Sequence, residues 1–417
     1  MASRDEARAS GAWSILLGAA LCMFCGQAAA MLFTFGVFAP EIAAATGWPP
    51  VTVAAAIGPA MMVASLLAPL VGRAADAFGV RRMALVGGPA YGFGLVMVGL
   101  LPQGPGQFVV VLTVASALGF AASPVLYAQL ATRWFTRRRG LSLSLIFASA
   151  SLGVAFWSPL AAKLIELYGW RAAYAGLGIM TGSVLLLCAL FLLRDPPAPA
   201  LAGAPAQAAG MTLPEALRGG TFWLIAAVFM IQTAVLAGVT VNLPVLLRLQ
   251  GISPVTAATV MAVAGGAMFV GRISAGLLLD RWFSPFVMAG FTLLPIMGLA
   301  VLLFELSPAT LYFAAMLIGL GLGSEMDAAA YIVSRAFGVR RFGAIYGMIA
   351  LAFGLASAAG PATTGAALSR GIPPSTLFAI GLAALVASLV LVLSLRRRHL
   401  PFGIDLPVQS DPLQDEK

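Results

Sequence analysis

Long apolar segments of about 20 residues, each the length that crosses a bilayer as one helix, alternate along the chain with short arginine-rich segments. The pattern predicts twelve membrane-spanning helices in two groups of six. The first group is expected near residues 13–38, 51–71, 83–101, 107–131, 141–165 and 172–193. The second is expected near residues 221–247, 255–279, 286–304, 309–334, 342–366 and 374–395.

The two groups repeat one another. Residues Pro40, Gly47, Pro50, Val51, Thr52, Gly72 and Asp76 recur 204 positions later as Pro244, Gly251, Pro254, Val255, Thr256, Gly276 and Asp280. A constant offset between otherwise diverged segments marks a duplicated unit. Parallel repeats of apolar helices are typical of one large group of membrane transporters, whose substrate site lies between the repeats.

Composition agrees with a chain that sits in a lipid bilayer. Hydrophobic residues make up 61% of the sequence and charged residues 9%, and mean hydropathy is +0.98, whereas soluble domains carry roughly 25% charged residues. The net charge of +9 is spread over short clusters between the apolar segments, so it indicates membrane topology and not a nucleic-acid surface.

Lysine and arginine fall mainly on one side of the predicted helices. With the N-terminus inside, nineteen lie on the cytoplasmic side and four on the other. The nineteen are Arg4, Arg8, Arg73, Arg81, Arg82, Arg133, Arg137, Arg138, Arg139, Arg194, Arg218, Arg281, Arg335, Arg340, Arg341, Arg396, Arg397, Arg398 and Lys417; the four are Lys163, Arg171, Arg248 and Arg370. We therefore expect a multi-pass protein of the cell (inner) membrane with both termini in the cytoplasm. The first apolar run continues to about Phe38, which is too long for a cleaved signal peptide.

The domain organisation follows from the same pattern. We expect an N-terminal six-helix bundle at 1–193, a cytoplasmic linker at 194–220, a C-terminal bundle at 221–395 and a cytoplasmic tail at 396–417. The linker is rich in proline and alanine, and the run from Thr212 to Glu215 predicts a capping box that starts a short surface helix. A monomer is expected.

Residues that would support enzyme or metal chemistry are scarce. Cys22, Cys25 and Cys188 all lie within predicted spans, where thiols usually serve as small packing residues. The only histidine, His399, follows the last helix, so no histidine-based metal site or proton relay is expected. We predict that the protein is not an enzyme and needs no cofactor or metal.

The loop between the second and third spans carries a recognisable motif. Residues 72–82 read GRAADAFGVRR, and this run resembles the signature loop of the major facilitator superfamily. The resemblance implies an all-α membrane fold with alternating access. Its glycines permit close helix approach, Asp76 can accept hydrogen bonds from a facing helix end or an arginine, and the arginines hold the loop on the cytoplasmic side. Conformational latch residues are therefore expected at Gly72, Asp76, Arg81, Gly276 and Asp280.

Within that superfamily, the segments 133–140, 169–171 and 335–343 resemble the monocarboxylate transporters and the oxalate/formate antiporters. Arg272 in the eighth span matches their substrate-binding arginine, in the same Arg-x-x-x-Gly register. A charge at bilayer depth costs about 2.5–3.5 kcal/mol, so it usually faces a cavity and serves a function. A guanidinium binds a carboxylate bidentately and stays protonated. Arg272 is therefore a candidate for substrate binding, with a structural ion pair as the alternative.

The chain also departs from these families. The lysine of the oxalate antiporter falls at Phe353, the lysine of the monocarboxylate transporters falls near Phe33, and their acid falls at Met268. One cation without the matching acid favours a monoanionic substrate and a different proton site. Trp157 and Phe353, if they face the cavity, would favour a substrate with an apolar or aromatic body.

Glu325 and Asp327 on the tenth span are the candidate proton-coupling residues. Both are expected at a depth similar to that of Arg272. Because a helix turns about 200° over two residues, the two acids cannot face the same way. Either acid could carry a proton when Arg272 binds substrate, or could instead form a permanent salt bridge with Arg272. The sequence leaves both alternatives open for each acid.

Several other polar residues lie on spans that line the central cavity in the superfamily. They are Gln27, Tyr127, Gln129, Gln232, Asn242 and Tyr331. Each could bind substrate or form a hydrogen bond to a neighbouring helix. Gln27, Tyr127, Asn242 and Tyr331 are kept with Arg272 as candidate substrate-binding residues.

Three functions are compatible with this pattern. The first is a proton-coupled transporter of a small organic anion, a monocarboxylate or aromatic acid, and Arg272 favours it. The second is a proton-antiport exporter of drugs or metabolites, but the fifth span, at Gly153–Pro159, lacks the glycine-rich antiporter motif. The third, a sensor, would normally carry an additional soluble domain. We expect the first, with protons as the coupling ion.

Overall fold

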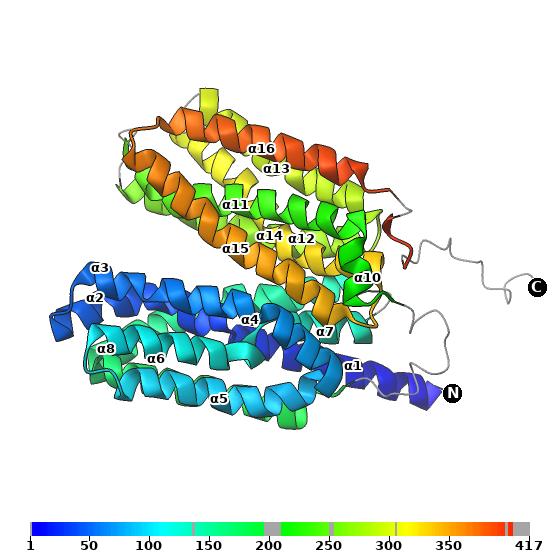
Figure 1. Cartoon of the computed structure of the whole chain (residues 1–417), viewed down its shortest axis with the longest axis horizontal. Helices are drawn as coiled ribbons and strands as arrows, with labels where there is room; N and C mark the ends of the chain where they lie inside the picture. The colour runs from blue at the N-terminus through cyan, green and yellow to red at the C-terminus, as the bar shows by residue number, and fades with distance from the viewer. Residues whose placement is uncertain are drawn as a thin grey trace, which may run out of the picture.

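The computed structural model describes residues 2–135, 138–195, 210–249, 254–304, 307–396 and 399–402. Within these ranges the chain forms two bundles of long helices that lie side by side (Figure 1). Several predicted features lie outside the described residues: 196–209 of the linker, 403–417 of the tail with Lys417, and Arg137, Arg397 and Arg398.

The N-terminal bundle contains the first six spans. Its elements are α1 (Ala2–Phe24), η1 (Ala28–Phe33), α2 (Thr34–Thr46), α3 (Pro50–Ala55), α4 (Ile57–Phe78), α5 (Val80–Leu100), α6 (Pro105–Leu118), η2 (Gly119–Ala122), α7 (Pro124–Trp134) and α8 (Arg139–Phe191). In α8 two spans follow one another directly. They are divided at Gly169, whose φ of 78° is a conformation that favours glycine.

The C-terminal bundle contains the other six spans. A short helix, α10 (Leu213–Arg218), precedes α11 (Gly220–Leu249), α12 (Pro254–Leu279), α13 (Ser284–Phe304), α14 (Pro308–Phe337), α15 (Phe342–Ser369) and α16 (Pro374–Ser394). The described residues include eleven helices long and apolar enough to cross a membrane, and dividing α8 at Gly169 gives the twelve predicted spans. The predicted all-α membrane fold is confirmed.

The surface of both bundles is apolar along the helices. Val86, Phe93 and Val110 of the N-terminal bundle are each at least 60% exposed, and so is Val390 of the C-terminal bundle. Soluble monomers rarely expose large contiguous apolar surfaces. This surface therefore suits contact with lipid, and the protein is a multi-pass integral membrane protein.

Two spans of the N-terminal bundle are broken, which the sequence pattern did not predict. The first span leaves helical geometry near Cys25 and Gly26 and continues as the π-helix η1. The fourth is interrupted by the 3₁₀-helix η2, after which Ser123 caps α7 by accepting a hydrogen bond from the Val125 N–H at 3.3 Å. Irregular backbone at membrane depth is tolerated where protein covers it, and here Gln27 of the first span bonds to Ser116 of the fourth.

The linker ends in the predicted capping box. The backbone N–H of Thr212 donates to Oε2 of Glu215 at 2.7 Å, and α10 begins at the next residue. The N–H of Met211 donates to the carbonyl of Phe337 at 2.8 Å. These bonds attach the described end of the linker to the last turn of α14.

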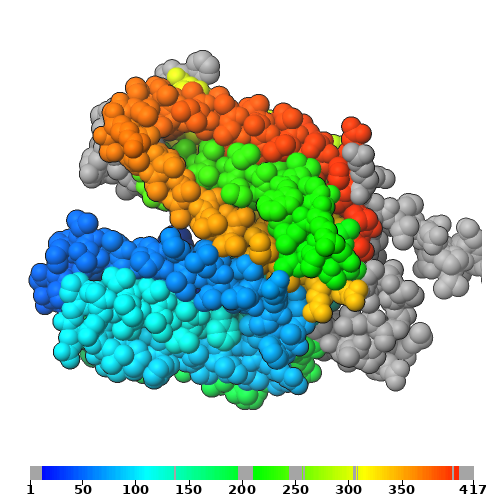
Figure 2. Space-filling model, in the orientation of Figure 1, coloured from blue at the N-terminus to red at the C-terminus, as the bar shows by residue number. Residues whose placement is uncertain are grey.

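The two bundles meet at one end of the molecule and separate at the other. We call the end that holds Asp76 and Asp280 the closed end, and the end that holds Gly47 and Gly371 the open end. Figure 2 shows a cleft between the bundles that is wide at the open end and shut at the closed end. The start of α1, the end of α16 and α10 lie at the closed end (Figure 1).

Glycine contacts locate the depth at which the cleft begins. A Cβ added to Gly347 of α15 would lie 2.6 Å from the carbonyl oxygen of Ala68 on α4. Gly354 of α15 packs against the Ser65 side chain in the same way. Gly58, seven residues before Ser65 and therefore on the same face of α4, has no such atom within 4 Å. The bundles therefore touch up to Ser65 and part beyond it.

Candidate functional site

Asp76 joins the two bundles at the closed end. Its carboxylate accepts hydrogen bonds from the N–H groups of Ala344 at 2.9 Å and Gly343 at 3.3 Å, which belong to the first turn of α15. Gln129 Nε2 donates to it at 2.9 Å and Arg133 Nη2 at 2.8 Å. A carboxylate at a helix N-terminus satisfies free N–H groups and interacts favourably with the helix dipole.

Asp280 makes the equivalent contact in the opposite direction. Its carboxylate accepts hydrogen bonds from the N–H of Gly140 at 2.6 Å and of Leu141 at 2.9 Å, at the start of α8. Burial raises the pKa of the Asp280 carboxyl. The two hydrogen bonds from backbone N–H groups lower this pKa, but by less than burial raises it. The ionised group is therefore held at some cost in free energy, which suits a contact that must be released.

The predicted latch glycines lie beside these carboxylates. Gly72 approaches the backbone of Gly343, and Gly276 approaches the backbone of Gly140, more closely than any side chain would allow. Arg81 lies elsewhere. Its Nε donates to the Ala189 carbonyl at 3.1 Å, so its described contacts stay within the N-terminal bundle. Four of the five predicted latch residues therefore meet across the bundles.

Arg272 lies one turn from Gly276 towards the open end, where the cleft begins. Its Nη1 is 3.6 Å from Oδ1 of Asp327, and both side chains are buried. Oδ2 of Asp327 accepts a hydrogen bond from the Ser144 hydroxyl of α8 at 2.7 Å. Asp327 therefore connects the C-terminal arginine to the N-terminal bundle. Ser144 could not be identified from the sequence, because a serine in an apolar helix carries no signal of its partner.

This charged group has unsatisfied hydrogen-bonding atoms. Arg272 Nε and Asp327 Oδ1 have no hydrogen-bond partner among the described residues. A buried donor or acceptor without a partner costs about 1–3 kcal/mol, and more if it is charged. The unpartnered N–H at Arg272 Nε is therefore a donor that an anion could accept from, whereas Asp327 Oδ1 offers only an acceptor.

Tight helix packing fixes the position of Arg272. A Cβ on Gly323 of α14 would lie 2.9 Å from the Arg272 backbone nitrogen and still closer to the Met268 carbonyl. Gly271 and Gly319 pack with similarly little space between α12 and α14. The two helices that carry Arg272 and the two acids are therefore held together as a unit.

Glu325 lies apart from this group, on another face of α14. The Thr233 hydroxyl of α11 lies 3.3 Å from its Oε2, and its Oε1 has no hydrogen-bond partner among the described residues. No ion pair within 4.0 Å joins it to Arg272 in the part of the chain that the structure describes. The structure thus brings together Arg272 and Asp327 but not Glu325.

The other predicted polar residues bond to neighbouring parts of the protein. Gln27 donates to the Ser116 carbonyl at 3.1 Å, and Asn242 donates to the Pro361 carbonyl at 3.2 Å. Tyr127 donates to the Ala121 carbonyl, and Tyr331 accepts from Arg335 Nη2 at 2.7 Å. All four make hydrogen bonds to other residues, so their substrate contact stays a prediction.

Trp157 also bonds within its own bundle. Its Nε1 donates to the Phe24 carbonyl at 2.8 Å, where the first span breaks, and its side chain is 2% exposed. In this conformation it does not line the cleft. Phe269 of α12, 36% exposed and three residues from Arg272, is a better candidate for contact with an apolar substrate body.

Two six-helix bundles, joined at one end and enclosing a buried charged group where their cleft begins, define a multi-pass membrane transporter. The family model described as Major Facilitator Superfamily matches residues 16–361, and the chain belongs to that family. The resemblance seen in the sequence is thereby confirmed.

Relatives and solved structures agree. The chain is 25% identical over 355 residues to an uncharacterised transporter of this family, YhjX from Escherichia coli, covering 83% of this chain and 85% of the relative. It is 25% identical over 300 residues to monocarboxylate transporter 13 from Bos taurus, covering 70% and 68%. The human organic anion transporter MFSD10 has a similar fold, with a TM-score of 0.71, 16% identity and coverage of 92% and 99%. The E. coli fucose:proton symporter gives a TM-score of 0.69, 14% identity and coverage of 91% and 98%.

Proposed function

We propose that the protein is a secondary active transporter that moves a small organic monoanion, a monocarboxylate or an aromatic acid, together with protons. The observation that carries this proposal is the buried guanidinium of Arg272 at the floor of the cleft, with an unpartnered Nε and its nearest carboxylate oxygen 3.6 Å away. A carboxylate entering from the open end would supply the acceptors that this guanidinium lacks.

A permanent salt bridge between α12 and α14 is a weaker explanation. Gly271, Gly319 and Gly323 already pack these helices closely, so no ion pair is needed to fasten them. A structural pair would also be expected to form short hydrogen bonds, because breaking or misaligning buried ions is costly. The loose contact between Arg272 and Asp327 instead suits a pair that separates when substrate binds.

Substrate size and class follow from the surroundings of Arg272. A single cation neutralises one carboxylate, which favours a monoanion. The nearby Phe269 and the partly buried Phe353 favour an apolar or aromatic body. The relative named monocarboxylate transporter 13 and the structural neighbour named organic anion transporter support this class.

Alternating access would use the contacts at the closed end. Binding of a carboxylate to Arg272 weakens its attraction for Asp327, and Asp327 is also the acceptor for Ser144 of the other bundle. Release of this bond, together with those of Asp76 and Asp280, would open the closed end. We assign the closed end to the cytoplasm from the distribution of arginines, so this conformation faces outward.

Uptake by proteoliposomes tests the proposal. Labelled pyruvate, lactate, benzoate and phenylacetate would be offered to the wild type under an inward proton gradient, and to Arg272→Ala. We expect gradient-stimulated uptake of at least one anion by the wild type and its loss in Arg272→Ala. The matched control is Arg281→Ala, an exposed arginine just past the end of the same helix, which should retain uptake. Uptake that is indifferent to Arg272→Ala would contradict the proposal.

A further inference from the structure

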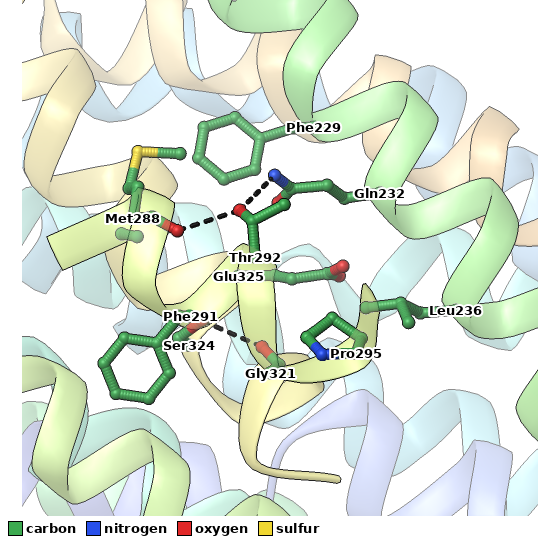
Figure 3. A pocket seen from close by; sticks show the side chains of 11 residues that line it. Phe229, Gln232, Leu236, Met288, Phe291, Thr292, Pro295, Gly321, Ser324 and Glu325 are labelled. Atoms are coloured by element: carbon green, nitrogen blue, oxygen red, sulfur yellow. Dashed lines mark hydrogen bonds between the residues drawn. The ribbon is translucent and has the colours of Figure 1, made fainter. Parts of the chain in front are cut away.

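A small cavity lies inside the C-terminal bundle between α11, α13 and α14 (Figure 3), and Arg272 is not among the residues that line it. Its volume of about 10 Å³ is enough for roughly one water molecule. Polar residues Gln232, Thr292, Ser324 and Glu325 border it on some sides, and apolar residues, Phe229, Leu236, Met288 and Phe291 among them, border it on the others. The Glu325 side chain extends into this space towards α11 (Figure 3).

The Glu325 carboxyl has few partners there. The residue is 3% exposed, one carboxyl oxygen lies 3.3 Å from the Thr233 hydroxyl, and the other has no hydrogen-bond partner among the described residues. An ionised carboxylate normally accepts several hydrogen bonds or pairs with a cation when it is buried. Glu325 does neither in this conformation.

The donors around the cavity are already committed to other acceptors. Gln232 Nε2 donates to the Thr292 hydroxyl at 2.9 Å and to the Ser388 hydroxyl at 3.1 Å. The Thr292 hydroxyl donates to the Met288 carbonyl at 2.8 Å, and the Ser324 hydroxyl donates to the Gly321 carbonyl at 2.8 Å. None of these groups is free to solvate an anion. A neutral carboxylic acid, with one water molecule beside it, fits the cavity.

The other charged groups near Glu325 belong to the anion site. Thr233 and Gln232 face it from α11 and Thr292 from α13, all uncharged, while Arg272 on α12 and Asp327 on another face of α14 carry charge. Asp327 has the Ser144 hydroxyl at 2.7 Å and Arg272 at 3.6 Å, so its ionised form is supported. The two acids therefore differ in their surroundings although they are two residues apart.

We propose that Glu325 carries the coupled proton, in a cavity separate from the anion site, and that Asp327 remains ionised as the counter-ion of Arg272. This inference rests on the proposed transport of an organic anion. In the outward-facing state Glu325 is a neutral acid; when the closed end opens, its O–H bond breaks, the proton passes to water on that side, and a carboxylate remains. Gly323, packed against the Arg272 backbone and two residues from Glu325, links movement at the anion site to the cavity.

Glu325→Gln tests the assignment because the amide has nearly the shape of the protonated acid and cannot release a proton. In an electroneutral one-to-one symport, a gradient of about one pH unit supports about tenfold accumulation. We expect the wild type to approach this ratio and Glu325→Gln to fall to a ratio of about one. Exchange of labelled for unlabelled anion should persist in Glu325→Gln, since exchange needs no deprotonation. The matched control is Ser394→Ala, which removes a local hydrogen bond to the Leu391 carbonyl at the exposed end of α16 and should retain coupling.

The outcomes separate this inference from the proposed function. If calorimetry without any gradient detects no anion binding to the wild-type protein, the proposed function itself is refuted. Preserved binding and exchange with lost accumulation in Glu325→Gln supports the inference. Three results would each overturn the inference. The first is undiminished accumulation by Glu325→Gln, and the second is loss of anion exchange by a folded Glu325→Gln protein. The third is accumulation by the wild type driven by a sodium gradient alone.

Discussion

At the scale of single residues, the important feature is how unequally the buried charges are satisfied. Asp76 accepts four hydrogen bonds, whereas Arg272, Asp327 and Glu325 each have a buried atom with no partner in the part of the chain that the structure describes. Polar groups in a membrane protein interior are expensive and usually serve a function. We therefore expect the incompletely bonded residues to change partners during transport and Asp76 to hold the bundles together.

Ser144→Ala is a prediction at this scale. Removing the hydroxyl leaves Asp327 without its only hydrogen bond from the other bundle, and bonds to charged groups contribute about 1.5–3 kcal/mol. We expect the closed end to open more often, so that the amides of Gly140 and Leu141 exchange hydrogen at least about tenfold faster in mass spectrometry. Ser142→Ala removes only a local bond to Arg138 and should leave the exchange rate unchanged.

The sequence predicted some of these residues and not others. It identified Arg272, Glu325 and Asp327, because charged residues stand out in apolar helices, and helix geometry placed the two acids on different faces. It could not assign those faces to particular neighbours, since that depends on the rotation of α14 within its bundle. The cavity at Glu325 and the Ser144 bond both follow from that rotation, so only the structure reveals them.

At the scale of elements, each bundle offers a carboxylate to the first turn of a helix in the other. Asp76, in the last turn of α4, accepts a hydrogen bond from the start of α15, and Asp280, directly after α12, accepts one from the start of α8. The duplicated sequence thus forms two equivalent contacts related by the repeat. Arg133 strengthens only the first, because its repeat partner Arg335 donates to Tyr331 instead. We therefore expect the Asp280 contact to release more easily.

Asp76→Asn and Asp280→Asn test the two contacts. Each change removes a charge at a helix N-terminus, for which losses of about 1 kcal/mol are typical. We expect each single variant to shift partly towards the conformation in which the bundles separate at the closed end. The double variant should shift further. Spin labels at positions 73 and 340 would report it as a longer distance between the bundles. The control is Glu215→Gln, a change at the same end of the molecule that removes only a local hydrogen bond, and it should leave the distance unaltered. An unaltered distance in both single variants and in the double variant would contradict the role of the latch.

Element boundaries were largely predictable, and the exceptions have physical reasons. Apolar length determines where a span begins and ends, and α12 was expected at 255–279 and is observed at Pro254–Leu279. The breaks in the first and fourth spans were missed because η1 and η2 lie in apolar runs rich in alanine and glycine. Only Ser123 and Pro124, a serine cap with proline at the first helical position, marked one of them.

At the scale of the whole molecule, we interpret the structure as one of the two conformations that alternating access requires. Among the described residues, the close glycine contacts between α4 and α15 run from Gly72 to Ser65 and none is found at Gly58, and the cleft opens beyond them (Figure 2). Arg272 lies at the boundary between the two regions. We propose that a ligand there would enter from the open end and act on the contacts that keep the closed end shut.

Thiol labelling tests this geometry. In a variant whose native cysteines are replaced, Gly58→Cys lies on the cleft-facing side of α4, with no added-Cβ contact within 4 Å. We expect a membrane-impermeant maleimide added to the outside of cells to label it. The matched control, Ser65→Cys, lies on the same face of α4 where that helix packs against Gly354 of α15, and it should stay unlabelled. Labelling of Gly58→Cys only after permeabilisation would contradict the proposed orientation or the outward-facing state.

The central claim is that Arg272 binds the carboxylate of the transported anion. It is tested most directly by calorimetric titration of the purified protein with the anion that it transports, in wild type, Arg272→Lys and Arg272→Ala. A lysine keeps the charge but loses the planar fork, so we predict binding about 10–100-fold weaker in Arg272→Lys and none detectable in Arg272→Ala. Equal affinity in all three proteins would contradict the account and place the anion elsewhere in the cleft.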